Sequence, residues 1–289
     1  MIKYLKITLK RDVFFLFAAI LVYLAGALIT RFQTRMFDVV NLALGMIVFV
    51  IGYALRCLME YLTESKINPY SRISFDRQDK KYQLVILTIA LFVSVFLVGY
   101  LILRRNMLIG VNLIYIMLIL FLFLLPGSRL GKLLQMNFSL IVEALIVSPL
   151  MLLLGRGMQS QNPTSEDFFI ALALFFLFVA SSIAYQFPEF GKDVKVRGRG
   201  FLELVGWETG IKLHNAMILV SYLTFIAFMV TRNTFSVYWP ALFTTFVSIF
   251  EIYLLTRVIA GMKPNWGMLR ATVFLQFFSI VYFLVFPVL

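Results

Sequence analysis

The chain has 289 residues, of which 62% are hydrophobic and 14% are charged, and its formal net charge is +12. Its mean hydropathy of +0.94 excludes an ordinary soluble domain, because repeated apolar runs near twenty residues are typical of helices that cross a bilayer. One cysteine excludes an internal disulfide and a multi-cysteine zinc site, and a single histidine argues against histidine-based metal chemistry.

The apolar runs predict about nine membrane-spanning helices that form a single domain over residues 1–289. In chain order we expect these spans at 13–30, 37–59, 83–103, 107–126, 138–155, 168–187, 214–231, 235–256 and 270–289. The first span follows basic residues, as a signal peptide would, but its apolar run is long for that role and we take it as a span. The expected fold is an all-α, polytopic membrane bundle.

Basic residues are divided unequally between the two sets of connecting segments. With the N-terminus inside the cell, the inner segments hold 19 of the 26 lysines and arginines, the outer segments hold six, and Arg56 lies within the second span. This asymmetry follows the positive-inside rule, so topology accounts for the basic charge and no nucleic-acid partner is needed. It predicts a multi-pass protein of the cell membrane whose N-terminus and two charged loops, 61–82 and 189–215, are cytoplasmic.

Two pairs of carboxylates lie where spans reach the inner face. Glu60 and Glu64 end the second span, and Glu189 and Asp193 follow the sixth. Residues four apart on a helix share a face, so each pair directs two carboxylates the same way. Charge is costly in a membrane protein, and Mg²⁺ is typically bound by one or two carboxylates together with substrate phosphates. The pairs therefore predict a Mg²⁺ site for a substrate with a diphosphate head and a hydrocarbon tail.

Lysines and arginines near the two pairs are candidates to bind the diphosphate, because both donate charge-assisted hydrogen bonds to phosphate oxygens. These candidates are Arg56, Lys66, Arg72, Lys195, Arg197 and Arg199.

A structural interpretation competes with the metal site. In it, Glu60 pairs with Arg56 one turn earlier, Glu64 is a solvated helix end, and the second pair belongs to a charged loop. Three further carboxylates lie in the apolar spans, and we assign no role to them: Asp38, Glu143 and Glu251. The single histidine, His214, follows the second charged loop and is expected to be a structural interface residue.

The residues from Phe187 to Gly206 begin Phe-Pro-Glu-Phe-Gly-Lys-Asp. This segment resembles the Phe-Pro-Asp-x-Glu-Gly-Asp motif of the UbiA superfamily of intramembrane prenyltransferases, with Glu189 and Asp193 at two aspartate positions. The family's first motif, Asn-Asp-x-x-Asp-x-x-x-Asp, is similar to 56–64, where Arg-Cys replaces the Asn-Asp start and Glu60 and Glu64 take the last two aspartate positions. The resemblance covers nearly the whole chain in length, span count and motif position.

The resemblance implies a function and an assignment of roles. Glu60, Glu64, Glu189 and Asp193 would hold Mg²⁺, and the cations named above would bind the diphosphate. The protein would transfer a polyprenyl group from an isoprenoid diphosphate to a lipophilic or aromatic acceptor within the membrane. Two other classes stay open: a catalytically inactive relative that binds a prenyl lipid, and a transporter, which would place charges at the bilayer midplane.

Overall fold

The computed structural model describes residues 2–34, 37–67, 85–86, 89–90, 92–94, 96–97, 99–100, 111–125, 140–159, 163–190 and 201–286. Within these ranges, the side chains of 2–11, 32–34, 58–67, 111–112 and 189 lie outside the description.

All regular elements in the described ranges are helical, which confirms the predicted all-α class. They are α1 (Ile2–Thr34), α2 (Val39–Ile67), α4 (Val111–Leu124), η2 (Ile146–Leu150), α6 (Met151–Met158), α7 (Ser165–Gln186), η3 (Phe187–Glu189), α8 (Phe201–Val205), α9 (Trp207–Thr231), α10 (Phe235–Tyr238), η4 (Trp239–Phe243), α11 (Thr244–Ile259) and α12 (Trp266–Val285).

Seven helical segments of the described chain are long and apolar enough to cross a membrane, and the protein is therefore a multi-pass membrane protein. These segments are Asp12–Arg31, Val39–Cys57, Leu140–Met158, Ser165–Gln186, Trp207–Thr231, Phe235–Ile259 and Trp266–Val285. Each matches a predicted span. The predicted span 107–126 corresponds to a shorter apolar helix, Leu113–Leu124, and most of the predicted span 83–103 lies outside the described residues.

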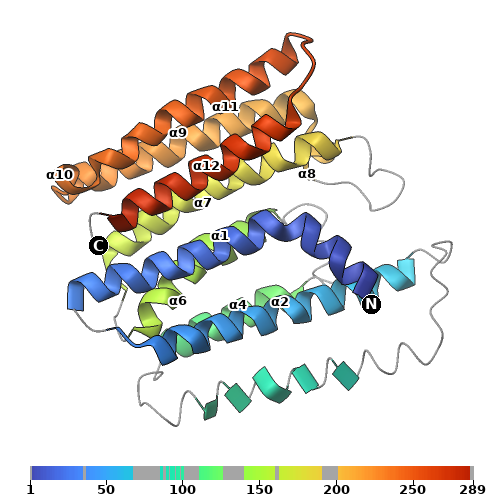
Figure 1. Cartoon of the computed structure of the whole chain (residues 1–289), viewed down its shortest axis with the longest axis vertical. Helices are drawn as coiled ribbons and strands as arrows, with labels where there is room; N and C mark the ends of the chain where they lie inside the picture. Colours follow the sequence, from blue (N-terminus) through green and yellow to red (C-terminus); the bar gives the residue numbers. More distant parts are fainter. Residues whose placement is uncertain are drawn as a thin grey trace.

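Helix α1 lies at the centre of the bundle. It packs against α6, α12 and α2, while α7 packs against α9 and α11 against α12. Figure 1 shows α2 and α4 on one side of α1, and α7, α9, α11 and α12 on the other. The N-terminus, the C-terminal end of α2 and α8 lie at one end of the bundle, whereas α10 and the C-terminus lie at the opposite end. We call the first of these the motif end.

Two helices at the motif end are longer than the sequence predicted. Helix α2 continues to Ile67 rather than ending at 59, and α9 begins at Trp207 rather than at 214. The prediction ended each span where apolar residues stop, but Glu, Lys and Leu are good helix formers and the backbone continues its hydrogen bonding through them. The two charged loops are correspondingly shorter than expected. Gly206 separates α8 from α9. Its φ of 83° is positive, a conformation that glycine adopts without steric cost.

Close contact between α1 and the helix that contains α6 depends on two glycines. A Cβ at Gly26 would meet the backbone carbonyl of Leu152, and a Cβ at Gly155 would meet the backbone carbonyl of Tyr23. Small residues let membrane helices approach each other closely, and the attraction then comes from backbone and side-chain packing. The two glycines therefore set the distance between α1 and α6.

Pro149 lies inside the helical segment Leu140–Met158 and falls within η2, a stretch of π-helix. Proline has no N–H and its ring clashes with the carbonyl four residues earlier, and a π turn is one way for a helix to accommodate the missing bond. Neighbouring Ser148 donates its hydroxyl to the carbonyl of Ala171 at 2.6 Å, which joins this wider turn to α7.

We expect Gly155→Ala to lower the free energy of unfolding by about 2 kcal/mol, because the added methyl group must displace the backbone of α1. Thermal unfolding in detergent or nanodiscs measures this change. Gly99→Ala is the matched control, because no atom of the described residues lies within 4 Å of its added Cβ. Equal stability of the two variants would contradict close packing of α1 on α6.

Candidate functional site

The backbone of the structure brings the two predicted motifs to the same end of the bundle. Glu60 and Glu64 lie one turn apart in the last part of α2, and Glu189 ends η3 directly after α7. Figure 1 shows both helices reaching the motif end. The side chains of these glutamates and of Lys66 are outside the description, as are the complete residues Arg72, Asp193, Lys195, Arg197 and Arg199. Their assigned roles therefore stay predictions.

Contacts hold the residues on both sides of the second motif. Gln186, the last residue of α7, accepts a hydrogen bond from the backbone N–H of Leu202 in α8 at 3.1 Å. This contact brings together the two ends of the charged segment 187–200. Phe187 is buried and packs edge-on against Trp207, with ring centroids 4.6 Å apart, and Trp207 packs against Trp266 at 5.9 Å. Tryptophan is enriched at membrane–water interfaces, so these contacts are consistent with an interfacial position for the motif.

Arg56 is the one predicted site residue whose side-chain surroundings the structure describes. Its guanidinium pairs with the carboxylate of Glu143, a residue 87 positions later in the chain. It also lies over the ring of Phe15, 5.2 Å from the centroid, in a cation–π contact. The arginine is buried, and the side chain of Glu143 is 26% exposed. Glu143, which was assigned no role from the sequence, is thus part of the first motif's surroundings.

A second carboxylate lies beside this pair. Asp12 is buried near the start of the first membrane-spanning segment and accepts a hydrogen bond from the hydroxyl of Tyr53 at 3.1 Å. Tyr53 lies one turn before Arg56 on α2, and its ring stacks with Phe15. The rings of Tyr53 and Phe15 thus link Asp12 to Arg56, which lies one helical turn deeper than Glu60.

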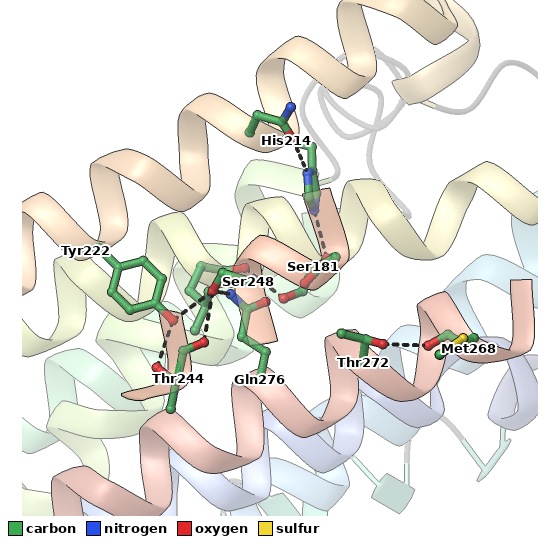
Figure 2. A network of polar contacts seen from close by, with 11 residues as sticks. Ser181, His214, Tyr222, Thr244, Ser248, Met268, Thr272 and Gln276 are labelled. Atoms are coloured by element: carbon green, nitrogen blue, oxygen red, sulfur yellow. Dashed lines mark hydrogen bonds and ion pairs between the residues drawn. The ribbon is translucent and has the colours of Figure 1, made fainter. Parts of the chain in front are cut away.

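A separate polar network lies between α9, α11 and α12 (Figure 2). His214 Nε2 is 2.7 Å from Glu251 Oε1, and its Nδ1 is 2.9 Å from Asn215 Oδ1. Both members of the pair are fully buried. His214 lies two turns inside α9 rather than after a loop, and Glu251 lies in the middle of α11. The prediction of an interface role for His214 agrees with this contact.

A second group of hydrogen bonds lies farther along α9 and α11, toward the opposite end of the bundle. Tyr222 Oη lies 2.7 Å from Thr244 Oγ1 and 2.8 Å from Ser248 Oγ, and the amide of Gln276 donates to Ser248 Oγ. All four side chains are buried. Polar groups inside a membrane protein are satisfied within the protein because the bilayer core supplies no water.

The end opposite the motifs is held by a buried ion pair. Arg156 pairs with Asp167 at the start of α7, and both side chains are almost completely buried. The second carboxylate oxygen of Asp167 accepts from the backbone N–H and the hydroxyl of Thr164, which caps the helix. Gln159 bonds to the backbone N–H and carbonyl of Asp38. These contacts connect the loops at this end and are structural.

The implied Mg²⁺ can be compared with the donors that the structure describes. Among the described residues, no group of three or more His, Cys, Asp or Glu side chains is placed to hold a metal ion. The four carboxylates of the two motifs lie outside that comparison, and oxygen donors of this type are the ones Mg²⁺ prefers. The chemistry of the predicted donor set fits the ion.

Comparison with known proteins adds no family assignment. A scan of the chain against protein-family models finds no match, and a search of curated proteins finds none.

Periodic polar residues on apolar helices are the signal that would have located the second network. Thr244, Ser248 and Glu251 recur every three or four residues on α11, as do Thr272 and Gln276 on α12. Such a stripe on an otherwise apolar helix indicates a polar face buried against other helices, because polar groups do not face lipid.

We expect Glu143→Gln to lower the free energy of unfolding by about 2 kcal/mol, because it removes the charge of the Glu143 carboxylate from the buried guanidinium of Arg56. In the Arg56→Gln background the same substitution should cost much less. A double-mutant cycle by thermal unfolding measures this coupling. Additive effects of the two substitutions would show that the pair contributes no coupling energy.

Proposed function

We propose that the protein is a Mg²⁺-dependent prenyltransferase of the UbiA type, which transfers a polyprenyl group from an isoprenoid diphosphate to a lipophilic or aromatic acceptor. One observation carries this proposal: α2 and α7 both end at the same end of the bundle. One predicted carboxylate pair lies in the last part of α2, and the other begins directly after α7. A diphosphate that spans two such pairs would be held at the membrane surface with its tail directed into the bundle.

The residues at the motif end have separable roles in this proposal. Glu60, Glu64, Glu189 and Asp193 would hold Mg²⁺, which supplies Lewis-acid stabilisation of the diphosphate leaving group. Lys66, Arg72, Lys195, Arg197 and Arg199 would donate hydrogen bonds to phosphate oxygens. The backbone N–H of Leu202 donates to the side-chain carbonyl of Gln186, so the residues on either side of this charged segment lie close together.

Arg56 would have a different role in diphosphate binding. Its contact with Glu143 and with Phe15 fixes the guanidinium one turn below Glu60. Arg56 itself occupies one of the two positions at which the family's Asn-Asp start is replaced, and it would donate to a phosphate oxygen in exchange for the Glu143 carboxylate.

Aromatic side chains close to the motif end support handling of a positively charged allylic group. The rings of Phe14, Phe15, Phe178 and Phe277 contact one another with centroids 5.6 to 6.4 Å apart. Aromatic faces stabilise a cation, and buried rings exclude water that would otherwise capture it. These four residues lie on α1, α7 and α12, and Phe15 also contacts Tyr53 and Arg56 of α2.

We expect the purified protein to release diphosphate from farnesyl or geranylgeranyl diphosphate only when Mg²⁺ is present. Glu64→Gln and Asp193→Asn should each lower the rate by a factor of about 10² or more, because each removes a negative ligand from the metal that stabilises the leaving group. Diphosphate release is measured with a coupled phosphate assay after extraction of the lipid product.

Glu208→Gln is the matched control, because Glu208 is an exposed carboxylate at the motif end that belongs to neither pair. It should retain the activity of the unmodified protein. Binding of the donor without Mg²⁺-dependent release would contradict the transferase and favour a protein that only binds a prenyl lipid.

A further inference from the structure

A groove of about 520 Å³ opens on the surface of the bundle where α12 packs against α7. This volume lies within the range of pockets that bind small molecules. One lining residue belongs to the end of α7 and five belong to α12: Tyr185, Arg270, Ala271, Phe274, Leu275 and Phe278. None of the six belongs to the two carboxylate motifs or to the polar network around Glu251.

The groove lies on the outward face of α12. Arg270, Phe274 and Phe278 are four residues apart and therefore share one side of the helix. Gln276 is buried and is directed the other way, toward α11 (Figure 2). Leu275 and Phe278 are 52% and 40% exposed. Because α12 is long and apolar enough to span a membrane, these exposed side chains face lipid.

The polar residues of the groove lie at one of its ends. Arg270 follows Trp266 by one turn, near the start of α12, and this helix begins at the motif end (Figure 1). The guanidinium carbon of Arg270 lies over the ring of Tyr185, 5.9 Å from its centroid, in a cation–π contact. Phe278 is eight residues after Arg270, a rise of about 12 Å along the helix. The groove thus has a cationic end near the membrane surface and an apolar end deeper in the bilayer.

Rings of α1 hold the groove in shape. Phe17 stacks on Phe274 with ring centroids 4.3 Å apart and lies 6.3 Å from Phe278. Phe14 stacks on Tyr185 at 4.6 Å. Stacked aromatic pairs are stabilising beyond the area that they bury, so both walls are held by the protein itself. A ligand would therefore enter a groove that is already formed, and less conformational entropy is lost on binding.

The charge and the position of the groove indicate a lipid with an anionic head. Arginine presents several donors in one plane and binds phosphate oxygens with charge-assisted hydrogen bonds. The apolar part of the groove faces the hydrocarbon region, where acyl chains are the molecules at hand. In the predicted topology the motif end is cytoplasmic, and the cytoplasmic leaflet carries anionic lipids.

We propose that this groove binds one anionic glycerophospholipid, with its phosphate on Arg270 and an acyl chain along Ala271, Phe274, Leu275 and Phe278. The bound lipid would join α12 to α7 at the membrane surface. The proposal is independent of prenyl transfer, since the groove and the two motifs share no residue.

Native mass spectrometry of the purified, delipidated full-length protein tests the site. Phosphatidylglycerol should bind with a Kd at least about tenfold lower than that of phosphatidylcholine, because the choline group of the second lipid neutralises its phosphate. This comparison needs no variant to fold. Equal affinity for the two lipids would overturn the requirement for an anionic head.

Arg270→Gln should raise the Kd for phosphatidylglycerol about tenfold, the effect of losing a charge-assisted hydrogen bond. Arg257→Gln is the matched control, because Arg257 is an exposed arginine in the last turn of α11 that does not line the groove. Its guanidinium also makes a cation–π contact with a tyrosine, 5.7 Å from the ring centroid of Tyr253. The control should leave the Kd unchanged. Equal losses in the two variants would overturn the site, since binding would then follow surface charge alone.

Ala271→Phe tests the apolar part of the groove and keeps the arginine. Ala271 is exposed, so a larger side chain there fills the space for the acyl chain without disturbing the core. We expect about tenfold weaker binding of phosphatidylglycerol at unchanged thermal stability, because the chain loses apolar contact area. Unchanged affinity would overturn the placement of the chain. Displacement of the phospholipid by farnesyl diphosphate would assign the groove to an isoprenoid and overturn the phospholipid.

Discussion

A charge buried in a membrane protein must find its partner within the protein, and this constraint accounts for much of the arrangement of the helices. In the described part of the chain, two ion pairs and one histidine–carboxylate contact satisfy it: Arg56 with Glu143, Arg156 with Asp167, and His214 with Glu251. Each joins two different helical segments. Removing a carboxylate would weaken the compensation of a buried cation, so these contacts favour packing of the segments that they join.

The exposure of each pair decides whether its side chains can contact a ligand. The pair of Arg156 and Asp167 is almost completely buried at the end opposite the motifs and has its remaining oxygen used in a helix cap, so it stabilises that end. Arg56 and Glu143 lie at the motif end, where Glu143 is partly exposed and Glu60 is one turn away. Arg56 therefore lies one turn from the proposed diphosphate site. The polar network around Glu251 is a second polar region, on the other side of α1.

The sequence predicted the helices well and the contacts between them poorly. Long apolar runs located seven spans because the cost of burying polar backbone in lipid leaves a signal in the sequence itself. The ends of α2 and α9 were missed because helical hydrogen bonding continues beyond the apolar residues. The partners of Arg56 and Glu251 could not be predicted, since they lie 87 and 37 residues away and only the packing of the helices brings them together.

The central claim is that both carboxylate motifs lie at one face of the membrane, and sided cysteine labelling in intact cells tests it most directly. In a Cys57→Ala background, Ser65→Cys and Gly191→Cys report the two motifs, and Ser236→Cys on α10 reports the opposite end. The account predicts that a membrane-impermeant maleimide labels the α10 position in intact cells and the two motif positions only after permeabilisation. Labelling of the two motif positions from opposite sides would contradict it.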